Sequence, residues 1–364
     1  MKKNVAVTVL VLAAFSAFAG GKKDSDIETL VMENSISEID SPISPIVLPS
    51  PQTDNPGKGP HSRKPTIDGE KIGVKESWAY VMLDREKYFS TSMPITDLCY
   101  FSADINSYGE LTSIPNPKRF SSYTGRIHLV VTCTGRALTH FSIDPNGKCR
   151  KGIIDAIVAA SANYDGIQID FENVGGRDRS NFMLFLKDIK KALPEGKIFS
   201  IALPARTKLL SDEIYDYAKI SEIVDRILIM AYDEHWSGGS PGPVASMDWC
   251  KRVINYARTV IPKEKLIMGL PFYGRSWQNE SYGSAWIFTS MERIMNQNNI
   301  QSVDRKDSIP YFEYDQTVHV TAYYDDAYSL VERCRMYQLY NVDKLGFWRV
   351  GQEDVSFWDW LEIK

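Results

Sequence analysis

Two carboxylic acids placed two positions apart, Asp170 and Glu172, are the side chains of this sequence best suited to acid–base chemistry. They lie at the end of the segment YDGIQIDFE at 164–172, whose alternating apolar residues predict a β-strand. Side chains alternate between the two faces of a strand, so Gln168 lies on the same face as both acids. The opposite face is apolar and consists of Ile167, Ile169 and Phe171.

Two carboxylates on one face of a strand interact, because their Cβ atoms lie roughly 6.5–7 Å apart. Burying both as unpaired anions costs free energy, and the cost falls when one of them stays protonated. A carboxyl group that is neutral near pH 7 can act as a general acid. The alternative is a structural pair of acids held by hydrogen bonds, but the flanking pattern favours the catalytic interpretation.

The elements that must position these acids are short apolar runs alternating with amphipathic stretches. Strands separated by helices make right-handed crossovers, and eight of them predict an α/β fold, a (β/α)8 TIM barrel. A doubly wound sheet is the alternative, but no glycine-rich dinucleotide turn follows the first strand. The expected strands are 78–83, 97–101, 127–132, 166–171, 198–203, 226–230, 266–270 and 345–348. The expected helices include 153–162, 179–192, 247–259 and 328–340.

The barrel is predicted to occupy residues 71–364, with a small insertion at about 278–319 after the seventh strand, a stretch too long for a plain loop. In such a barrel Gln168, Asp170 and Glu172 point inward. Glu172 then lies at the carboxyl end of the fourth strand, the end where barrel enzymes carry their chemistry.

The residues before the barrel resemble an export signal and a tether. Residues 1–19 contain two lysines, an apolar run and a small-residue cleavage pattern, which predicts a signal peptide; an uncleaved anchor is the alternative. Residues 20–70 are rich in Pro and Ser and predict a disordered linker. We expect an exported protein, secreted, periplasmic or at the cell surface, with no membrane span in the mature chain.

Charge and composition exclude some classes of binding partner and cofactor. The formal net charge is −4 and no long basic run occurs, so we expect no nucleic-acid partner. The five cysteines form no CxxC pair and the five histidines form no HExxH motif, so we expect neither a metal nor another cofactor. One disulfide remains possible without an assigned pairing. We expect a monomer.

Four ordered motifs resemble glycoside hydrolase family 18. The run DGIQIDFE is similar to the family's fourth-strand signature DGxDxDxE, and MAYDEHW at 230–236 is similar to its sixth-strand MxYD motif. The segments MGLPFYGRSW at 268–277 and GFWRVGQED at 346–354 resemble the seventh and eighth strands. The resemblance covers the chain from about residue 71 to the end. The variant motif MxYDxH, followed by PGPVAS at 241–246, is similar to bacterial members acting on cell-wall or spore glycans.

The resemblance implies roles for individual residues. Glu172 corresponds to the proton donor, and Asp170 to the acid that orients the acetamido group of the substrate. Tyr232 corresponds to the phenol that holds this group. Asp233 is its neighbour, and Trp348 corresponds to the floor beneath the sugar. Further substrate-binding positions implied by the resemblance are Met230, Tyr273, Arg275, Gln168, Tyr80 and Phe101.

The implied reaction is hydrolysis of β-1,4-linked glycans that contain N-acetylglucosamine, such as chitin, chito-oligosaccharides or peptidoglycan. Family 18 is an exception to the two-carboxylate rule, because the acetamido oxygen of the substrate is the nucleophile and the anomeric configuration is retained. The alternative function is that of a non-catalytic, lectin-like glycan-binding protein. The presence of Glu172 favours the enzyme, since lectin-like members typically replace the donor.

One segment and one position depart from the family's patterns, and the segment is VVTCTG at 130–135, which differs from the third-strand SxGG pattern. Gln168 stands where many members carry an aspartate, so a proton relay through three acids is in doubt; we expect Gln168 to hydrogen-bond Asp170 instead. Asp165 is the first acid of the signature, yet it falls on the wrong face of an ideal strand.

Overall fold

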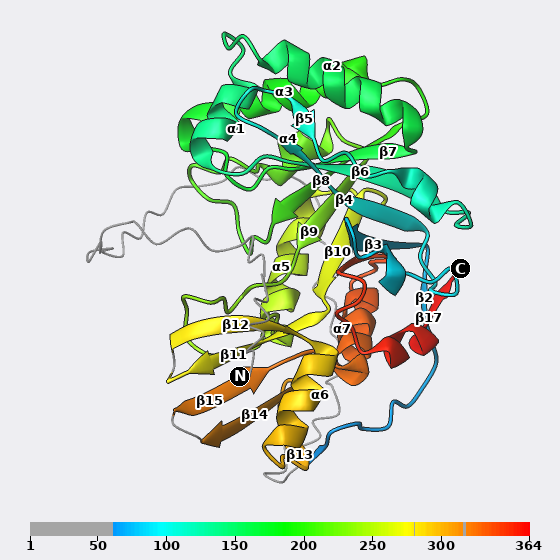
Figure 1. Ribbon diagram of the computed structural model, residues 1–364, viewed down its shortest axis with the longest axis vertical. Helices are drawn as coiled ribbons and strands as arrows, with labels where there is room; N and C mark the ends of the chain where they lie inside the picture. Colours follow the sequence, from blue (N-terminus) through cyan, green and yellow to red (C-terminus); the bar gives the residue numbers. More distant parts are fainter. Residues whose placement is uncertain (1–60, 280, 316–317) are drawn as a thin grey trace, which may run out of the picture. The chain divides into compact units, whose positions relative to one another are not determined.

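Eight parallel strands close into a barrel in the computed structural model, which describes residues 61–279, 281–315 and 318–364 (Figure 1). The predicted signal peptide and residues 20–60 of the predicted linker lie outside the described residues. The strand order is β3-β16-β10-β9-β8-β7-β6-β4, and pairing of β3 with β4 completes the ring. The strands are β3 (Glu76–Met82), β4 (Asp97–Ile105), β6 (Arg126–Thr132), β7 (Gly166–Asp170), β8 (Ile198–Pro204), β9 (Arg226–Met230), β10 (Leu266–Pro271) and β16 (Lys344–Trp348). The predicted TIM barrel is confirmed.

Helices cover the outside of this ring, and Figure 1 shows α1, α2 and α3 beside β6, β7 and β8. The helices of the barrel are α1 (Arg136–Ile143), α2 (Arg150–Ala160), α3 (Arg179–Ala192), α4 (Tyr217–Ser221), α5 (Met247–Val260) and α7 (Ala327–Leu339). Short 3-10 helices η1 (Glu86–Tyr88) and η2 (Pro117–Phe120) follow β3 and β4 instead. The chain also contains the 3-10 helices η3 (Ser161–Asn163), η4 (Gly176–Asp178) and η5 (Val355–Trp360).

Local sequence explains where helices begin. The Ser246 side chain accepts a hydrogen bond from Trp249 N at the start of α5, and Asp326 forms a capping box with Ser329 at the start of α7. Each cap satisfies a backbone N–H that has no partner within the helix.

The alternation expected for β7 matches its packing. Ile167, Ile169 and Phe171 belong to the core between strands and helices, where the Phe171 ring lies 5.6 Å from that of Phe185 on α3. Gln168 and Asp170, on the inward face, are buried. The period of two therefore decides which β7 side chains reach the interior of the barrel.

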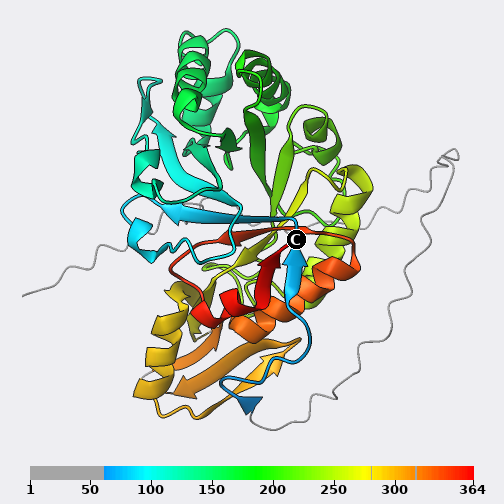
Figure 2. The same cartoon turned by 90° about the vertical axis from the view of Figure 1, so that its right-hand side faces the viewer.

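The insertion is a small antiparallel sheet with one helix, and Figure 2 shows it in yellow to orange. Its strands are β11 (Tyr273–Gln278), β12 (Ser281–Ile287), β13 (Ser302–Lys306), β14 (Ile309–Asp315) and β15 (His319–Tyr323), and its helix is α6 (Phe288–Gln297). The insertion thus begins at 273 and ends at 323, wider than the expected 278–319 at both ends. Two residues inside the predicted linker, β1 (His61–Ser62), pair with β13.

Three further strands and the cysteines complete the description. Strand β5 (Leu111–Thr112) pairs with β4, and β2 (Ile72–Val74) pairs with β17 (Leu361–Ile363). All five cysteines are free thiols. Among the described residues, no helix is both long enough and apolar enough to cross a membrane.

Candidate active site

The carboxyl end of β7 carries the two acids that the sequence singled out. Asp170 is the last residue of the strand, is 7% exposed, and its Oδ1 has no hydrogen-bond partner. Glu172 follows in the turn after the strand, and its side chain is exposed to solvent. Both acids thus lie at the carboxyl end of β7, the end at which barrel enzymes carry their chemistry.

Burial and neighbouring charge favour the protonated form of both acids. Burial, with the Coulombic effect of Asp233, raises the pKa of Glu172 to about 7. Burial and the Coulombic effect of Glu172 raise the pKa of Asp170 well above its usual range. The two titrations are linked, so the pair as a unit retains a proton at neutral pH. A retained proton is what a general acid requires.

Tyr232 lies two residues beyond the end of β9, close to this acid pair. Burial, followed by the negative charges of Asp170 and Glu172, raises the pKa of its phenol well above the usual range. The hydroxyl therefore stays protonated and can donate a hydrogen bond to an oxygen atom of a bound molecule.

Asp233 is held by two residues of β11. Tyr273 Oη donates to Asp233 Oδ1 at 2.7 Å, and Arg275 Nη2 donates to the same oxygen at 2.7 Å. Arg275 also donates through Nη1 to Ser237 Oγ at 2.8 Å. The first strand of the insertion thus fixes the loop that follows β9, and Arg275 partly offsets the charge of Asp233 beside Glu172.

Aromatic rings form one wall at the same end of the barrel. The Trp348 ring, at the end of β16, lies 5.1 Å from that of Tyr80 and 4.9 Å from that of Phe101. These rings and Met230 belong to the apolar cluster inside the barrel. Trp348, Phe101 and Met230 remain partly exposed, so solvent reaches this wall. A flat aromatic surface beside carboxyl groups suits a sugar ring, which has apolar C–H faces and polar edges.

The expected contact between Gln168 and Asp170 is wrong. Gln168 Oε1 accepts a hydrogen bond from Tyr80 Oη at 2.5 Å, and its Nε2 donates to Ser200 Oγ at 3.4 Å. The amide is thus engaged with neighbouring strands on both sides. Sequence parity placed Gln168 and Asp170 on one face, but side chains of β3 and β8 compete for the amide, and the sequence does not show them.

The match to known proteins agrees with this geometry. The family described as Glycosyl hydrolases family 18 matches residues 116–353. The chain belongs to this family. The family model thus covers the ends of β7, β9 and β16, where the acid pair, Tyr232 and Trp348 lie.

Individual relatives are more distant. The putative sporulation-specific glycosylase YdhD of Bacillus subtilis is 27% identical over 339 residues, 81% of this chain and 77% of that protein. The spore cortex-lytic enzyme SleL of Bacillus cereus superposes with a TM-score of 0.72 at 24% identity, covering 82% of this chain and 76% of that one. A chitinase from Chromobacterium violaceum superposes with a TM-score of 0.68 at 21% identity, covering 79% and 97%. The two solved structures share the barrel fold.

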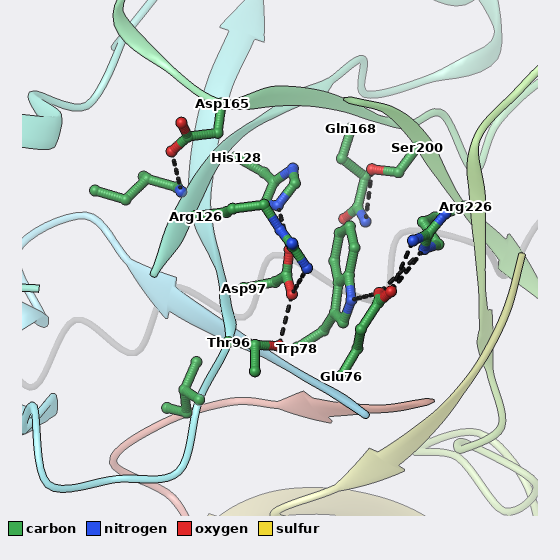
Figure 3. A network of polar contacts seen from close by, with 12 residues as sticks. Glu76, Trp78, Thr96, Asp97, Arg126, His128, Asp165, Gln168, Ser200 and Arg226 are labelled. Atoms are coloured by element: carbon green, nitrogen blue, oxygen red, sulfur yellow. Dashed lines mark hydrogen bonds and ion pairs between the residues drawn. The ribbon is translucent and has the colours of Figure 1, made fainter. Parts of the chain in front are cut away.

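Asp165, the first acid of the family signature, lies at the opposite end of β7. Its Oδ2 accepts a hydrogen bond from Ile127 N at 2.8 Å, next to the polar network shown in Figure 3. Asp165 therefore links the starts of β6 and β7 and does not share a face with the acid pair.

Three residues that sequence reasoning missed contact site residues or their backbone. Ser200 binds Gln168, Ser237 binds Arg275, and Tyr215 hydrogen-bonds the backbone on both sides of Glu172. Each lies on a different strand or loop from its partner, so sequence spacing contains no signal for the contact. In the described part of the chain, no group of three or more His, Cys, Asp or Glu side chains could hold a metal ion.

Proposed function

We propose that this chain is a retaining glycosidase that cleaves β-1,4 bonds on the reducing side of N-acetylated sugars, with Glu172 as the proton donor. The observation that carries the proposal is the pair of carboxyl groups whose pKa values are raised, at the end of β7, beside a protonated phenol. Family membership supports the same reaction type.

In the proposed first step, Glu172 transfers its proton to the glycosidic oxygen, and the bond to the anomeric carbon breaks. The acetamido carbonyl oxygen of the same sugar attacks this carbon, and an oxazolinium ion forms. Asp170 accepts a hydrogen bond from the acetamido N–H and, in its ionised form, stabilises the positive charge, while Tyr232 donates a hydrogen bond to the acetamido oxygen. Water then attacks the anomeric carbon from the face that the leaving group left, and Glu172 takes its proton as the bond forms. The bond to the acetamido oxygen breaks, so the acetamido group is regenerated and the configuration is retained.

We propose a glycan that contains N-acetylglucosamine, peptidoglycan or chitin, as the substrate. A glycosylase of sporulation, a spore cortex-lytic enzyme and a chitinase are all similar to this chain. The acetamido group that the mechanism requires is common to both polymers. We further propose that the protein reaches these polymers by export through the predicted signal peptide.

The test is product analysis on chito-oligosaccharides and on purified peptidoglycan, side by side, by mass spectrometry and proton NMR. We expect new reducing ends on N-acetylglucosamine, with the β-anomer formed first. The matched variant Glu172→Gln should abolish cleavage and keep oligosaccharide binding. Tight binding without cleavage by the native chain would support the lectin-like alternative, and an α-anomer formed first would contradict the mechanism.

Export has its own measurement. Expression of the full chain in a bacterial host should give a protein outside the cytoplasm with an N-terminus beginning near residue 20. Full-length chain confined to the cytoplasmic fraction would contradict the proposal.

A further inference from the structure

The turn that carries Glu172 is spanned by one buried hydroxyl group. Tyr215 Oη donates to Phe171 O at 2.8 Å and accepts a hydrogen bond from Val174 N at 3.2 Å. These two backbone groups begin and end the four-residue turn in which Glu172 is the second residue. The phenol oxygen therefore bridges the turn from a different loop, the one between β8 and α4.

Tyr215 is itself rigidly held. Its backbone N donates to Glu213 Oε1 at 2.9 Å, and Arg206 Nε donates to the other oxygen of that carboxylate at 2.6 Å. The ring packs edge-on against Phe182 of α3 at 5.9 Å between centroids, and the side chain is 6% exposed. Burial raises the pKa of the phenol, so the hydroxyl remains a donor throughout the range in which the enzyme operates.

We infer that Tyr215 is a positioning residue for the proton donor, an assignment that rests on the proposed function of Glu172. Donation to a glycosidic oxygen requires the carboxyl to be held within hydrogen-bond reach and in the correct direction. Glu172 has no side-chain hydrogen bond in its turn among the described contacts, and a side chain on a turn is oriented through its backbone. The Tyr215 bridge supplies that orientation, because it restrains the turn at both ends.

The protein contains a matched control for this inference. Tyr217 lies two residues further along the same loop and is 1% exposed, and its Oη donates to Pro204 O at 2.6 Å. Its hydrogen bond thus has the same donor, the same type of acceptor and similar burial, but it does not reach the turn of Glu172. Removing either hydroxyl by substitution with Phe deletes one oxygen atom from a buried ring.

The experiment compares Tyr215→Phe with Tyr217→Phe. We expect Tyr215→Phe to lower kcat on a chito-oligosaccharide about 10- to 100-fold, with KM within about twofold, because a misplaced catalytic group loses rate more than substrate affinity. We expect Tyr217→Phe to change kcat less than about threefold, although both variants lose stability, Tyr215→Phe more so because it leaves two backbone groups without their partner. Equal kcat in the two variants would overturn the inference.

A second readout does not depend on turnover. In protein carrying ¹³C-labelled glutamate carboxyl groups, the Glu172 signal is identified by its absence in Glu172→Gln and then titrated by NMR. We expect the pKa of Glu172 to move from about 7 toward its ordinary value in Tyr215→Phe, because a loosened turn lets the carboxyl move away from Asp170 and Asp233, and to stay in place in Tyr217→Phe. An unchanged titration in Tyr215→Phe would overturn the inference.

The two readouts also separate this inference from the proposed function. A native chain that cleaves no glycan, but whose Glu172 titration shifts in Tyr215→Phe, would refute the proposed function and retain the positioning role. If the native chain cleaves glycan and Tyr215→Phe cleaves it equally well, the proposed function is retained and the positioning role of Tyr215 is refuted. If Tyr215→Phe does not fold, Glu213→Gln weakens the same support, and we expect a smaller change of the same sign in both readouts.

Discussion

The two ends of the barrel differ in whether a buried carboxyl group has hydrogen-bond partners. At the amino end, Asp97 is fully buried and accepts hydrogen bonds from Arg126 Nε at 2.6 Å and from Thr96 Oγ1 at 2.6 Å, and its Oδ1 lies 2.8 Å from His128 Nε2 (Figure 3). At the carboxyl end, Asp170 is almost as buried, but its Oδ1 has no hydrogen-bond partner.

The difference appears in the pKa values. Burial alone would raise the pKa of Asp97, but hydrogen bonds from His128 and Arg126 outweigh burial and lower it. For Asp170, burial and the nearby Glu172 act in the same direction and raise the pKa. A satisfied carboxylate stabilises the fold, whereas an unsatisfied one costs stability and is available for chemistry. We therefore expect the carboxyl groups at the amino end to contribute stability and, on the proposed function, those at the carboxyl end to contribute catalysis.

The strongest test of the comparison is Asp170→Asn. We expect kcat to fall on the order of 10²- to 10⁴-fold, because the amide can neither share a proton with Glu172 nor stabilise a cation. Stability should not fall with it. A carboxyl whose pKa is raised by folding destabilises the protein increasingly as pH rises through the folded pKa, so the melting temperature of Asp170→Asn should equal or exceed that of the native chain at high pH. A melting temperature clearly below the native value at pH 8 would contradict the comparison.

The converse variant is Asp97→Asn. We expect the free energy of unfolding to fall by about 3 kcal/mol, since the change leaves buried donors without their charged partner. The stabilisation by Asp97 is present above the ordinary pKa of an aspartate and is lost as pH falls through its lower folded pKa, so the native chain should approach the variant in stability at acid pH. Chemical denaturation at pH 7 and pH 3 measures both effects. Under conditions in which it is folded, the variant should retain the kcat of the native chain. A large loss of kcat would contradict the assignment of a purely stabilising role to Asp97.

Trp348→Ala probes the aromatic wall. The ring is partly exposed and contacts Tyr80 and Phe101, so we expect a loss of kcat/KM of about 10- to 100-fold, together with a smaller loss of stability than a fully buried tryptophan would give. Steady-state kinetics with thermal denaturation gives the comparison. Losses of similar size in the free energy of unfolding and in the activation free energy for kcat/KM would identify Trp348 as a core residue.

The last expected effect, about tenfold at one pH unit above neutrality, is the pH dependence of the native chain. A proton donor with a pKa of about 7 is active when protonated, so kcat/KM should decline above neutral pH, by about tenfold for each further pH unit. A pH–rate profile on a soluble oligosaccharide measures this limb. A rate that is constant up to pH 9 would show that Glu172 is not the titrating donor in the free enzyme.

Regular elements were predictable because local pattern determines them. All eight barrel strands were expected from short apolar runs, and α3 from an amphipathic period, because these patterns bury one face of each element. The boundaries of the insertion were less predictable. The run 268–277 is continuous in sequence, but its second half leaves the barrel after Pro271 and becomes β11 of the insertion sheet.

By itself, the sequence determined the fold class, the family and the two acids at one strand end, because spacing along a strand decides which side chains share a face. Only the tertiary structure decided which groups those side chains meet. Gln168 binds Tyr80 and not Asp170, Asp165 lies at the far end of its strand, and Tyr215 reaches the turn of Glu172 from another loop. The physical reason is that hydrogen-bond partners come from elements distant in sequence, and only the closed barrel brings them within reach.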